Sequence, residues 1–472
     1  MTISTSPRAF APLAVIGPLC LFAGLLAGLS PGLAIGLALG AAFTLLVFAD
    51  LAAGLVVFAA LSFLEFSPLL SEAGGVTKIA GALLALGWLA RSAVDPAVRP
   101  RQFTTDHPFI SFVLLAFLGW SVVSVTWAKD VEIAIGYLQR YVLVIALLAI
   151  TYTAVSDRRR AIWIVAIVIV GSLVTALYGL AEPPAPEDAE RITSTVGNAN
   201  VLATILVSGL VLALAAAVAF RHQPAVVIAC LGVTGVCMLA FFFTGSRSGL
   251  VALLAVVLVA PLIAGKRRRT PMIAGGLCLL MLSGAFFFAL APQDIRDRLA
   301  TTSPGELPAE EGRTTLWKVG WRMVEDRPIQ GVGIGNFANT TIDYLIEPGQ
   351  TARSDQVVDD PKVAHNIYLH TLAELGVVGF VLLGTVLVFA LGCCLKAARI
   401  FARDGDGQME ILSRALFLAL VAILVADFFA SEQYSKILWL LLAMGPVMLA
   451  LAREAARHGG GNGGRSASPA AR

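Results

Sequence analysis

Four polar residues precede a long apolar run near the end of the chain. In "KVAHNIYLHTLAELGVVGF" (residues 362–380), His365, Asn366, His370 and Glu374 lead directly into a hydrophobic segment. An imidazole can take a proton from a hydroxyl group at neutral pH, because its usual pKa is near 6.5. We therefore regard His365, with Asn366 beside it, as a candidate for a chemical role.

The two histidines of this run are not expected to bind a metal together. Residues five apart on a helix are separated by about 140° around its axis, so His365 and His370 do not share a face. His370 and Glu374, at positions i and i+4, do share one. For that pair we favour a structural hydrogen bond over a chemical role. The sequence predicts neither a metal nor a cofactor.

Two arginines at the ends of other apolar runs indicate anion binding. Arg191 stands in "EDAERITSTVGNANVLA", ahead of Asn198 and Asn200, and Arg247 stands in "FFFTGSRSGLVALL". A cation at membrane depth generally faces a cavity or an anionic partner, and arginine suits bidentate contact with phosphate. The alternative is snorkelling of the arginines to the interface and helix capping by the asparagines. Because Arg313 falls on the same predicted side, we favour an anion-binding cluster.

The elements that must position these residues are membrane helices. Of the 472 residues, 58% are hydrophobic and 14% are charged, and the mean hydropathy is +0.83. A soluble domain carries roughly 25% charged residues, so this composition predicts an all-α polytopic membrane protein. Fourteen apolar runs qualify as spans, of which 32–48 and 51–65 are short enough to be half-helices or one bent element. We therefore predict 12–14 transmembrane helices.

Basic residues in the short loops predict the orientation of these helices. Arginine and lysine cluster in alternate loops, for example at 158–160 and 266–269, and such loops are usually cytoplasmic. Both termini are therefore predicted to be cytoplasmic, with the first apolar run near 10–29 retained as a span. The candidate site residues then lie on the opposite, outer side. The net charge of +3 is too small to suggest nucleic-acid binding.

One connection between spans is long. Residues 292–365 form a predicted outer loop, in which "GRTTLWKVGWRMVEDRPIQGVGIGNF" contains a candidate amphipathic helix lying against the membrane surface. "GVGIGN" at 331–336 resembles a dinucleotide-binding loop, but no βαβ context surrounds it, and we interpret it as a flexible turn. The predicted organisation is a transmembrane bundle over 1–291, this loop, C-terminal transmembrane helices over 366–452 and a flexible cytoplasmic tail over 453–472.

Four motifs in order carry a family resemblance. They are "RITSTVGNANVLA", "TGSRSG", "GRTTLWKVGWRMVEDRPIQGVGIGNF" and "HNIYLHTLAELGVVGF", between residues 191 and 380. This ordered set resembles the O-antigen ligase and polymerase superfamily of bacterial envelope glycosyltransferases. The resemblance covers most of the chain through its topology, although ligases of this family usually have 12 spans. It implies a membrane transferase of GT-C architecture that works without a metal, with one large periplasmic loop between late helices.

The resemblance also implies substrates and roles. The donor is a glycan on undecaprenyl diphosphate, and in the ligase branch the acceptor is a sugar hydroxyl of lipid A–core at the periplasmic face of the inner membrane. By motif, Arg191 and Arg247 hold the donor diphosphate, Arg313 completes the cationic site, and His365 activates the acceptor hydroxyl. Arginines can stabilise a leaving diphosphate by charge-assisted hydrogen bonds. One base and no obvious nucleophile imply a single, inverting displacement.

Three functions remain open at this stage. The extended "HNxYLHxxxELG" pattern and the single large late loop favour the ligase, including transfer to protein as a ligase-like alternative. A polymerase of the same superfamily would share the donor site. A transporter is the non-enzymatic alternative, and it ranks lowest because the charges lie mainly at the outer edge and no internal repeat is evident. The expected partners are the donor, the acceptor and membrane lipids.

Overall fold

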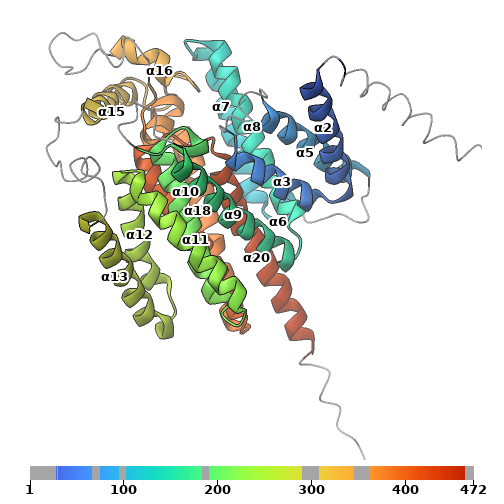
Figure 1. The fold of residues 1–472 in the computed structure, drawn as a ribbon. Helices are drawn as coiled ribbons and strands as arrows, with labels where there is room; N and C mark the ends of the chain where they lie inside the picture. Colours follow the sequence, from blue (N-terminus) through green and yellow to red (C-terminus); the bar gives the residue numbers. More distant parts are fainter. Residues whose placement is uncertain are drawn as a thin grey trace, which may run out of the picture.

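The protein is represented by a computed structural model, drawn as a ribbon in Figure 1. The structure describes Gly28 and residues 30–65, 75–94, 102–182, 191–289, 308–344 and 362–462. Within these ranges every regular element is a helix, which confirms the predicted fold class. Apart from Gly28, the predicted first span near 10–29 lies outside the described residues, as do 292–307 and 345–361 of the predicted loop.

The helices follow one another along the chain with mostly short connections. In order they are α2 (Pro31–Ala49), α3 (Leu51–Phe63), α5 (Val76–Val94), α6 (Phe103–Asp106), α7 (Pro108–Ser124), η2 (Val125–Trp127), α8 (Val131–Ala154), α9 (Arg158–Ala181), η4 (Ser194–Val196), α10 (Ala199–Ala219), α11 (Pro224–Phe243), α12 (Arg247–Ile263), α13 (Lys266–Ala289), α15 (Pro308–Asp326), α16 (Phe337–Thr340), η5 (Thr341–Tyr344), α18 (Ile367–Arg403), α19 (Gly407–Ala426), η6 (Asp427–Phe429) and α20 (Lys436–Asn462). The C-terminal spans predicted over 366–452 correspond to α18, α19 and α20.

Eight of the described helices are long and apolar enough to cross a membrane. Four shorter apolar helices, of 10–17 residues, accompany these eight in the described part of the chain. The two short runs at 32–48 and 51–65 are separate helices. Asp50 divides them, because its carboxylate accepts a hydrogen bond from the Ala52 N–H at 2.9 Å and so caps α3.

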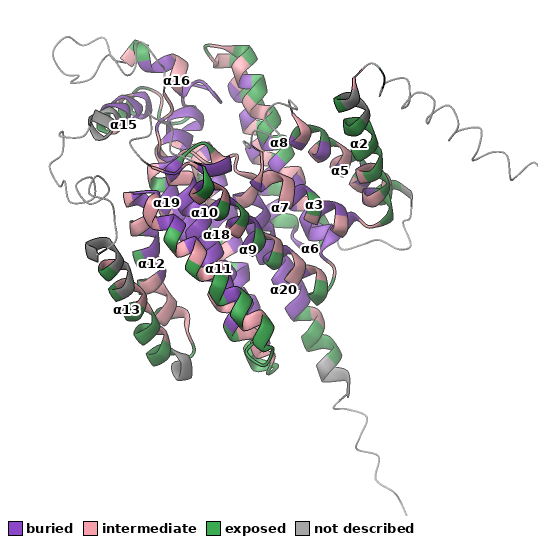
Figure 2. Cartoon of the chain, in the orientation of Figure 1, coloured by how far each residue is buried: buried purple, intermediate pink, exposed green. Residues whose placement is uncertain are grey.

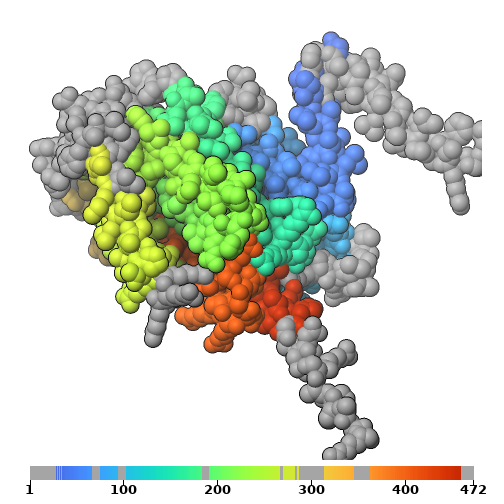
Figure 3. Space-filling model, turned by 60° about the horizontal axis from the view of Figure 1, so that its bottom comes forward, coloured from blue at the N-terminus to red at the C-terminus, as the bar shows by residue number. Residues whose placement is uncertain are grey.

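Helices α10 and α20 lie at the centre of the bundle. In each, 78% of the apolar window is buried, against 22% in α11, which lies at the periphery. Figure 2 shows this buried centre in purple. Helix α10 packs against α9, α11, α12 and α19, whereas α20 packs mainly against α8 and α18. The N-terminal helices in blue and α13 in yellow form opposite flanks of the body in Figure 3.

The outer surface of α7 is apolar and exposed, as expected of a surface that faces lipid. Phe109, Phe112 and Leu115 recur every three residues along one side of the helix and are 70%, 68% and 66% exposed. A contiguous apolar face of this kind is unfavourable in water and is typical of a lipid-facing helix. The protein is therefore a multi-pass membrane protein.

The amphipathic helix predicted in the long loop is α15. Leu316, Val319 and Met323 are buried on one face, while Trp321 is 54% exposed on the other. The amphipathic pattern is confirmed. Its buried face, however, packs against the first turns of α18, where Ala373 joins the same apolar cluster.

The predicted flexible tail over 453–472 begins as a helix. Helix α20 continues without interruption to Asn462, so the prediction is wrong for residues 453–462. The physical reason is local composition, because "REAARH" directly after the span consists largely of strong helix formers. Residues 463–472 lie outside the described residues.

Candidate functional site

His365 stands at the junction between the long loop and α18. The carbonyl of Ala364 accepts a hydrogen bond from Trp317 Nε1 at 2.9 Å, and the Asn366 N–H donates to Ser431 Oγ at 3.2 Å. His365 itself has φ of +48°, a left-handed conformation that is uncommon outside glycine and asparagine. Such a conformation persists only where the surroundings fix it. The backbone on both sides of His365 is therefore held in place from two other elements.

The environment of His365 favours the neutral imidazole. Burial is the largest cause that lowers the pKa of this group, to about 4, and the positive charges of Arg313 and Lys362 act in the same direction. A cationic neighbour disfavours a second positive charge. His365 is thus unprotonated at neutral pH and has a lone pair with which to accept a proton. The structure places Arg313 close enough to His365 for its charge to be felt.

The segments of Arg191 and Arg247 are joined by a hydrogen-bonded network. Arg191 donates from Nε to the Thr244 carbonyl at 2.7 Å and from Nη2 to Asn200 Oδ1 at 3.1 Å. Ser246 Oγ donates to the same Asn200 oxygen at 2.9 Å. Arg247 follows Ser246 as the first residue of α12. Two cationic segments about fifty residues apart in sequence are therefore brought together around one amide oxygen.

Two of the predicted supporting residues act as helix caps. The side-chain oxygen of Asn198 accepts hydrogen bonds from two backbone N–H groups in the first turn of α10. Asn366 does the same for α18. These bonds satisfy donors that have no partner inside the helix. Both asparagines thus have a structural function, and that of Asn366 fixes where His365 stands relative to α18.

His370 and Glu374 form a buried pair, both almost fully enclosed. Nε2 of His370 lies 3.1 Å from Oε1 of Glu374, an ion-pair contact outside the alignment of a good hydrogen bond. The same carboxylate oxygen accepts a hydrogen bond from the Phe337 N–H at 3.0 Å. The His370 ring stacks on the ring of Phe337 at 5.3 Å. Phe337 thus connects the loop to this pair on α18, whereas the hydrogen bond expected between His370 and Glu374 from the sequence is not formed.

The "GVGIGN" segment is a buried docking element. All residues over 331–337 are buried, and the N–H groups of Val332 and Gly333 donate to the carbonyls of Ala373 and Glu374, both at 2.9 Å. The prediction of a flexible turn is wrong here. Its glycines have positive φ, which only glycine adopts readily, and that conformation brings the loop backbone into direct contact with the backbone of α18.

Gly376 produces the kink in α18 that receives this loop. Its φ of +64° and ψ of −170° interrupt the helix, in a region of backbone space that is essentially restricted to glycine. The kink lets the Val377 N–H donate to the Pro328 carbonyl at 2.9 Å. The freed carbonyl of Leu375 accepts from Trp120 Nε1 at 2.8 Å. The loop, α7 and α18 are thus joined at one point.

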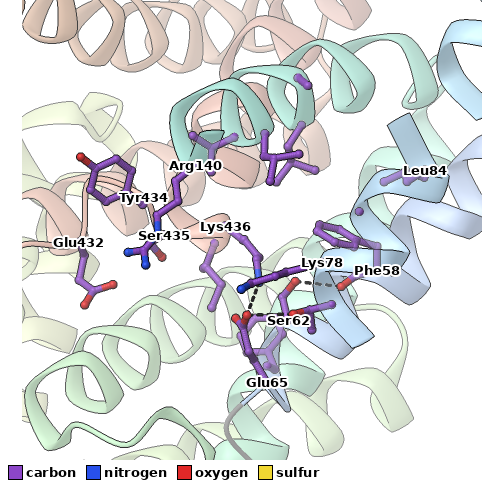
Figure 4. Close-up of a pocket in the computed structure, with 18 of the residues that line it drawn as sticks. Phe58, Ser62, Glu65, Lys78, Leu84, Arg140, Glu432, Tyr434, Ser435 and Lys436 are labelled. Carbon is purple, nitrogen blue, oxygen red and sulfur yellow. Dashed lines mark hydrogen bonds and ion pairs between the residues drawn. The ribbon is translucent and has the colours of Figure 1, made fainter. Parts of the chain in front are cut away.

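A cavity of about 500 Å³ opens between α3, α5, α8, α10 and α20. Its charged lining residues are Glu65, Lys78, Arg140, Glu432 and Lys436, several of which are labelled in Figure 4. The remainder of the lining is largely apolar. Charged groups from three regions of the chain, 65–78, Arg140 and 432–436, therefore share one cavity.

The cavity adjoins both groups of predicted site residues without including them. Its wall contains Thr195, in the short helix that follows Arg191, and Ser431, which accepts the hydrogen bond from the Asn366 N–H. Neither Arg191 nor His365 lines it. The cavity is therefore connected to the chain segment of Arg191 through Thr195 and to the His365 segment through Ser431.

The sequence contained one signal for this cavity that our motif analysis missed. Arg140 falls near the start of the apolar run at 138–155, which is one of the fourteen predicted spans, and a cation within a span generally marks a functional site. In the structure its guanidinium carbon lies 4.5 Å from the centre of the Tyr137 ring, and the side chain lines the cavity. Lys78 and Lys436, in the first turns of their helices, gave no comparable signal.

A family comparison covers part of this site. Residues 232–384 match the O-antigen ligase family model. This match confirms the resemblance drawn from the motifs. The O-antigen ligase segment contains Arg247, Arg313 and His365, whereas Arg191 and the charged residues of the cavity lie outside it.

A curated relative extends the similarity beyond the O-antigen ligase segment. The chain is 25% identical over 364 residues to the teichuronic acid biosynthesis protein TuaE of Bacillus subtilis (strain 168), which covers 70% of each chain. Together with the family match, this similarity supports a polysaccharide ligase or polymerase type of role. Among the residues that the structure describes, no group of three or more His, Cys, Asp or Glu side chains is placed to hold a metal ion.

Proposed function

We propose that this protein is a ligase of the bacterial inner membrane, which transfers a glycan from undecaprenyl diphosphate to a sugar hydroxyl of lipid A–core at the periplasmic face. The observation that carries the proposal is the O-antigen ligase match over the segment with Arg247, Arg313 and His365. The neutral state of His365 is compatible with a base, and the Arg191 network provides positive charge near a membrane-level cavity.

In the proposed reaction, the acceptor oxygen attacks the anomeric carbon of the donor glycan. The bond from that carbon to the diphosphate oxygen breaks, and undecaprenyl diphosphate leaves with the electron pair. His365 takes the proton of the acceptor hydroxyl. Arg191, Arg247 and Arg313 stabilise the negative charge that develops on the leaving group, through charge-assisted hydrogen bonds. One displacement inverts the anomeric configuration, and none of these steps requires a metal.

A polymerase is the second candidate function. The similarity to a teichuronic acid biosynthesis protein supports it. Such an enzyme would use the same donor site and would transfer one lipid-linked glycan to another. Transfer to a protein hydroxyl is the third acceptor that the same chemistry allows.

Reconstitution of the purified full-length chain distinguishes these acceptors. The protein is incubated with undecaprenyl-diphosphate-linked glycan and lipid A–core in EDTA, and the mobility of both lipids is followed on a gel. A ligase shifts lipid A–core. Lengthening of the lipid-linked glycan, with lipid A–core unchanged, would establish the polymerase instead. Activity that requires added Mg²⁺ or Mn²⁺ would contradict the metal-independent reaction.

The pH profile of transfer provides a separate test of the base. If His365 takes the proton, kcat/KM is expected to fall only as the pH approaches about 4, since burial lowers its pKa to that value in the free protein. Below this pH the imidazole is protonated and cannot accept. A bound diphosphate adds negative charge and raises that pKa, so the acid limb of kcat is expected at higher pH than the limb of kcat/KM. Coinciding limbs near 6.5 would contradict the lowered pKa of His365, whereas full activity well below pH 4 would contradict His365 as the base.

A further inference from the structure

Four aromatic rings meet at the chain segments that hold His365. They are Trp317 of α15, Tyr368 in the first turn of α18, and Phe428 and Phe429 of η6, and together they form what we call the aromatic cluster. The centre of the Phe428 ring lies 5.6 Å from that of Trp317 and 6.2 Å from that of Tyr368. It lies 5.3 Å from the centre of the Phe429 ring. Phe428 is therefore the common neighbour of the other three rings.

The aromatic cluster is attached to the backbone on both sides of His365. Trp317 Nε1 donates a hydrogen bond at 2.9 Å to the carbonyl of Ala364, which belongs to the peptide group between Ala364 and His365. On the other side, the Asn366 N–H donates to Ser431 Oγ at 3.2 Å, and Ser431 directly follows the η6 segment. The rings and the imidazole are thus parts of one connected structure.

The aromatic cluster directs its polar groups toward the protein and exposes ring surface. The indole N–H of Trp317 donates to the Ala364 carbonyl, and the hydroxyl of Tyr368 donates to the Leu424 carbonyl at 2.8 Å. In the aromatic belt of a membrane protein, by contrast, the N–H and O–H groups face headgroups and water. Phe428, which has no polar group, is 45% exposed. Its ring is therefore available for contact with the apolar face of a ligand.

Polar groups lie next to the aromatic cluster and indicate the kind of ligand. Arg313 stands four residues before Trp317 on α15, so both side chains lie on the same side of that helix. Burial and the charges of Arg313 and Lys362 lower the pKa of His365, so both cations act on this imidazole. A hydrocarbon chain placed here would desolvate these groups at a cost. A sugar ring suits both parts, because its C–H groups meet an aromatic face and its hydroxyl groups form hydrogen bonds at its edge.

We propose that the aromatic cluster is a platform for the acceptor glycan, in which one sugar ring stacks on Phe428 and turns its hydroxyl edge toward His365. The proposal rests on the proposed function for the presence of a glycan acceptor. It adds the residues that bind and orient this acceptor, which the motifs and the arginine network do not provide. The stacked ring positions the attacking hydroxyl group and makes no covalent bond to the protein.

Transfer kinetics separate stacking from simple hydrophobicity. Phe428→Leu keeps an apolar side chain and removes the aromatic face. It is expected to raise KM for the acceptor by roughly three- to tenfold, with a much smaller effect on kcat and on KM for the donor. Phe428→Trp retains an aromatic ring and is expected to raise KM for the acceptor by less than about twofold. Initial rates in reconstituted vesicles, with lipid A–core as the varied substrate, measure these constants.

A binding measurement tests the platform without transfer. The oligosaccharide released from lipid A–core by mild acid, which carries no acyl chain, is titrated into the full-length protein in lipid nanodiscs by calorimetry. The glycan released from the donor lipid is titrated in the same way, since it would be the acceptor in a polymerase. At least one of the two is expected to bind, and Phe428→Leu is expected to weaken that binding by roughly three- to tenfold. Binding of neither oligosaccharide would overturn the proposal.

A matched control separates the platform from a general effect on exposed aromatic residues. Phe109→Leu makes the same change at a ring of α7 that is 70% exposed and lies outside the aromatic cluster, and it is expected to leave KM for the acceptor unchanged. The thermal midpoint of each variant reports folding. An equal rise of KM in Phe109→Leu and Phe428→Leu would overturn the proposal, as would a Phe428→Leu variant that folds and binds the acceptor as the wild type does.

The platform and the proposed function can fail independently. Binding of an oligosaccharide that depends on Phe428, without transfer to any acceptor, would retain the platform and reject the transferase. Transfer that is lost in His365→Asn, with KM for the acceptor unaffected by Phe428→Leu, would retain the transferase and reject the platform.

Discussion

Replacement of His365 by asparagine is expected to lower the rate of glycan transfer by roughly 10²–10⁴-fold, the usual contribution of a positioned general base. Asparagine tolerates the left-handed backbone that His365 adopts, with φ of +48°, so the change removes the base and keeps the backbone. Initial rates of transfer to the acceptor in reconstituted vesicles measure the effect. The binding of the donor lipid is expected to persist.

Two further variants serve as controls for the effect of His365→Asn. His365→Gly relaxes the backbone and also lacks the base, so it is expected to be as inactive as His365→Asn. His222→Ala alters an exposed histidine between α10 and α11 and is expected to transfer at the rate of the wild type. Full activity in His365→Asn would remove His365 from the chemistry, whichever acceptor is used.

Gly376→Ala is expected to destabilise the protein more than any other single methyl addition to α18. The backbone there has φ of +64° and ψ of −170°, a conformation that costs a non-glycine residue roughly 1–3 kcal/mol. A Cβ would also collide with the carbonyl of Ile329, which is backbone and cannot move aside. We expect a total loss of about 3 kcal/mol or more and release of the docked loop.

Thermal unfolding and limited proteolysis of the purified protein measure this loss. The midpoint is expected to fall, and cleavage within 308–344 is expected to accelerate. Gly384→Ala provides the matched control, because this glycine lies in the same helix with nothing within 4 Å of an added Cβ. Alanine there is expected to be neutral or slightly stabilising. Equal behaviour of the two variants would contradict the kink as the docking point.

The membrane class and most of the helices followed from the sequence because both are local properties. Apolar runs of sufficient length specify spans, and Asp50 marks the break between α2 and α3 by capping the second helix. The loop helix α15 was visible in its amphipathic pattern. In contrast, the helical continuation of α20 to Asn462 was missed, because the glycines after residue 458 were given more weight than the helix formers before them.

The sequence predicted which site residues lie together only where those residues belong to one motif. His365 and its cap Asn366 are adjacent, so their common place was evident. The cavity cations Lys78, Arg140 and Lys436 come from three helices, and only the packing of α20 against α8 and the N-terminal helices brings them together. Contacts between segments that are distant in sequence leave no recognisable pattern in any one stretch of the sequence. The buried state of "GVGIGN" was missed for the same reason, since its partner backbone lies in α18.

The kink at Gly376 also bears on how far His365 lies from the centre of the bilayer. Helix α18 has 37 residues, and the 27 that follow Gly376 extend over roughly 40 Å at 1.5 Å per residue. This length equals the thickness of a bilayer with both headgroup layers, roughly 40–45 Å. The helix after the kink is therefore long enough to cross the whole membrane. In a bilayer of that thickness it would hold His365 at the level of the headgroups or above it. In the proposed transfer, the sugars that meet His365 there stay hydrated throughout, and only the isoprenoid tail of the carrier lipid has to remain in hydrocarbon.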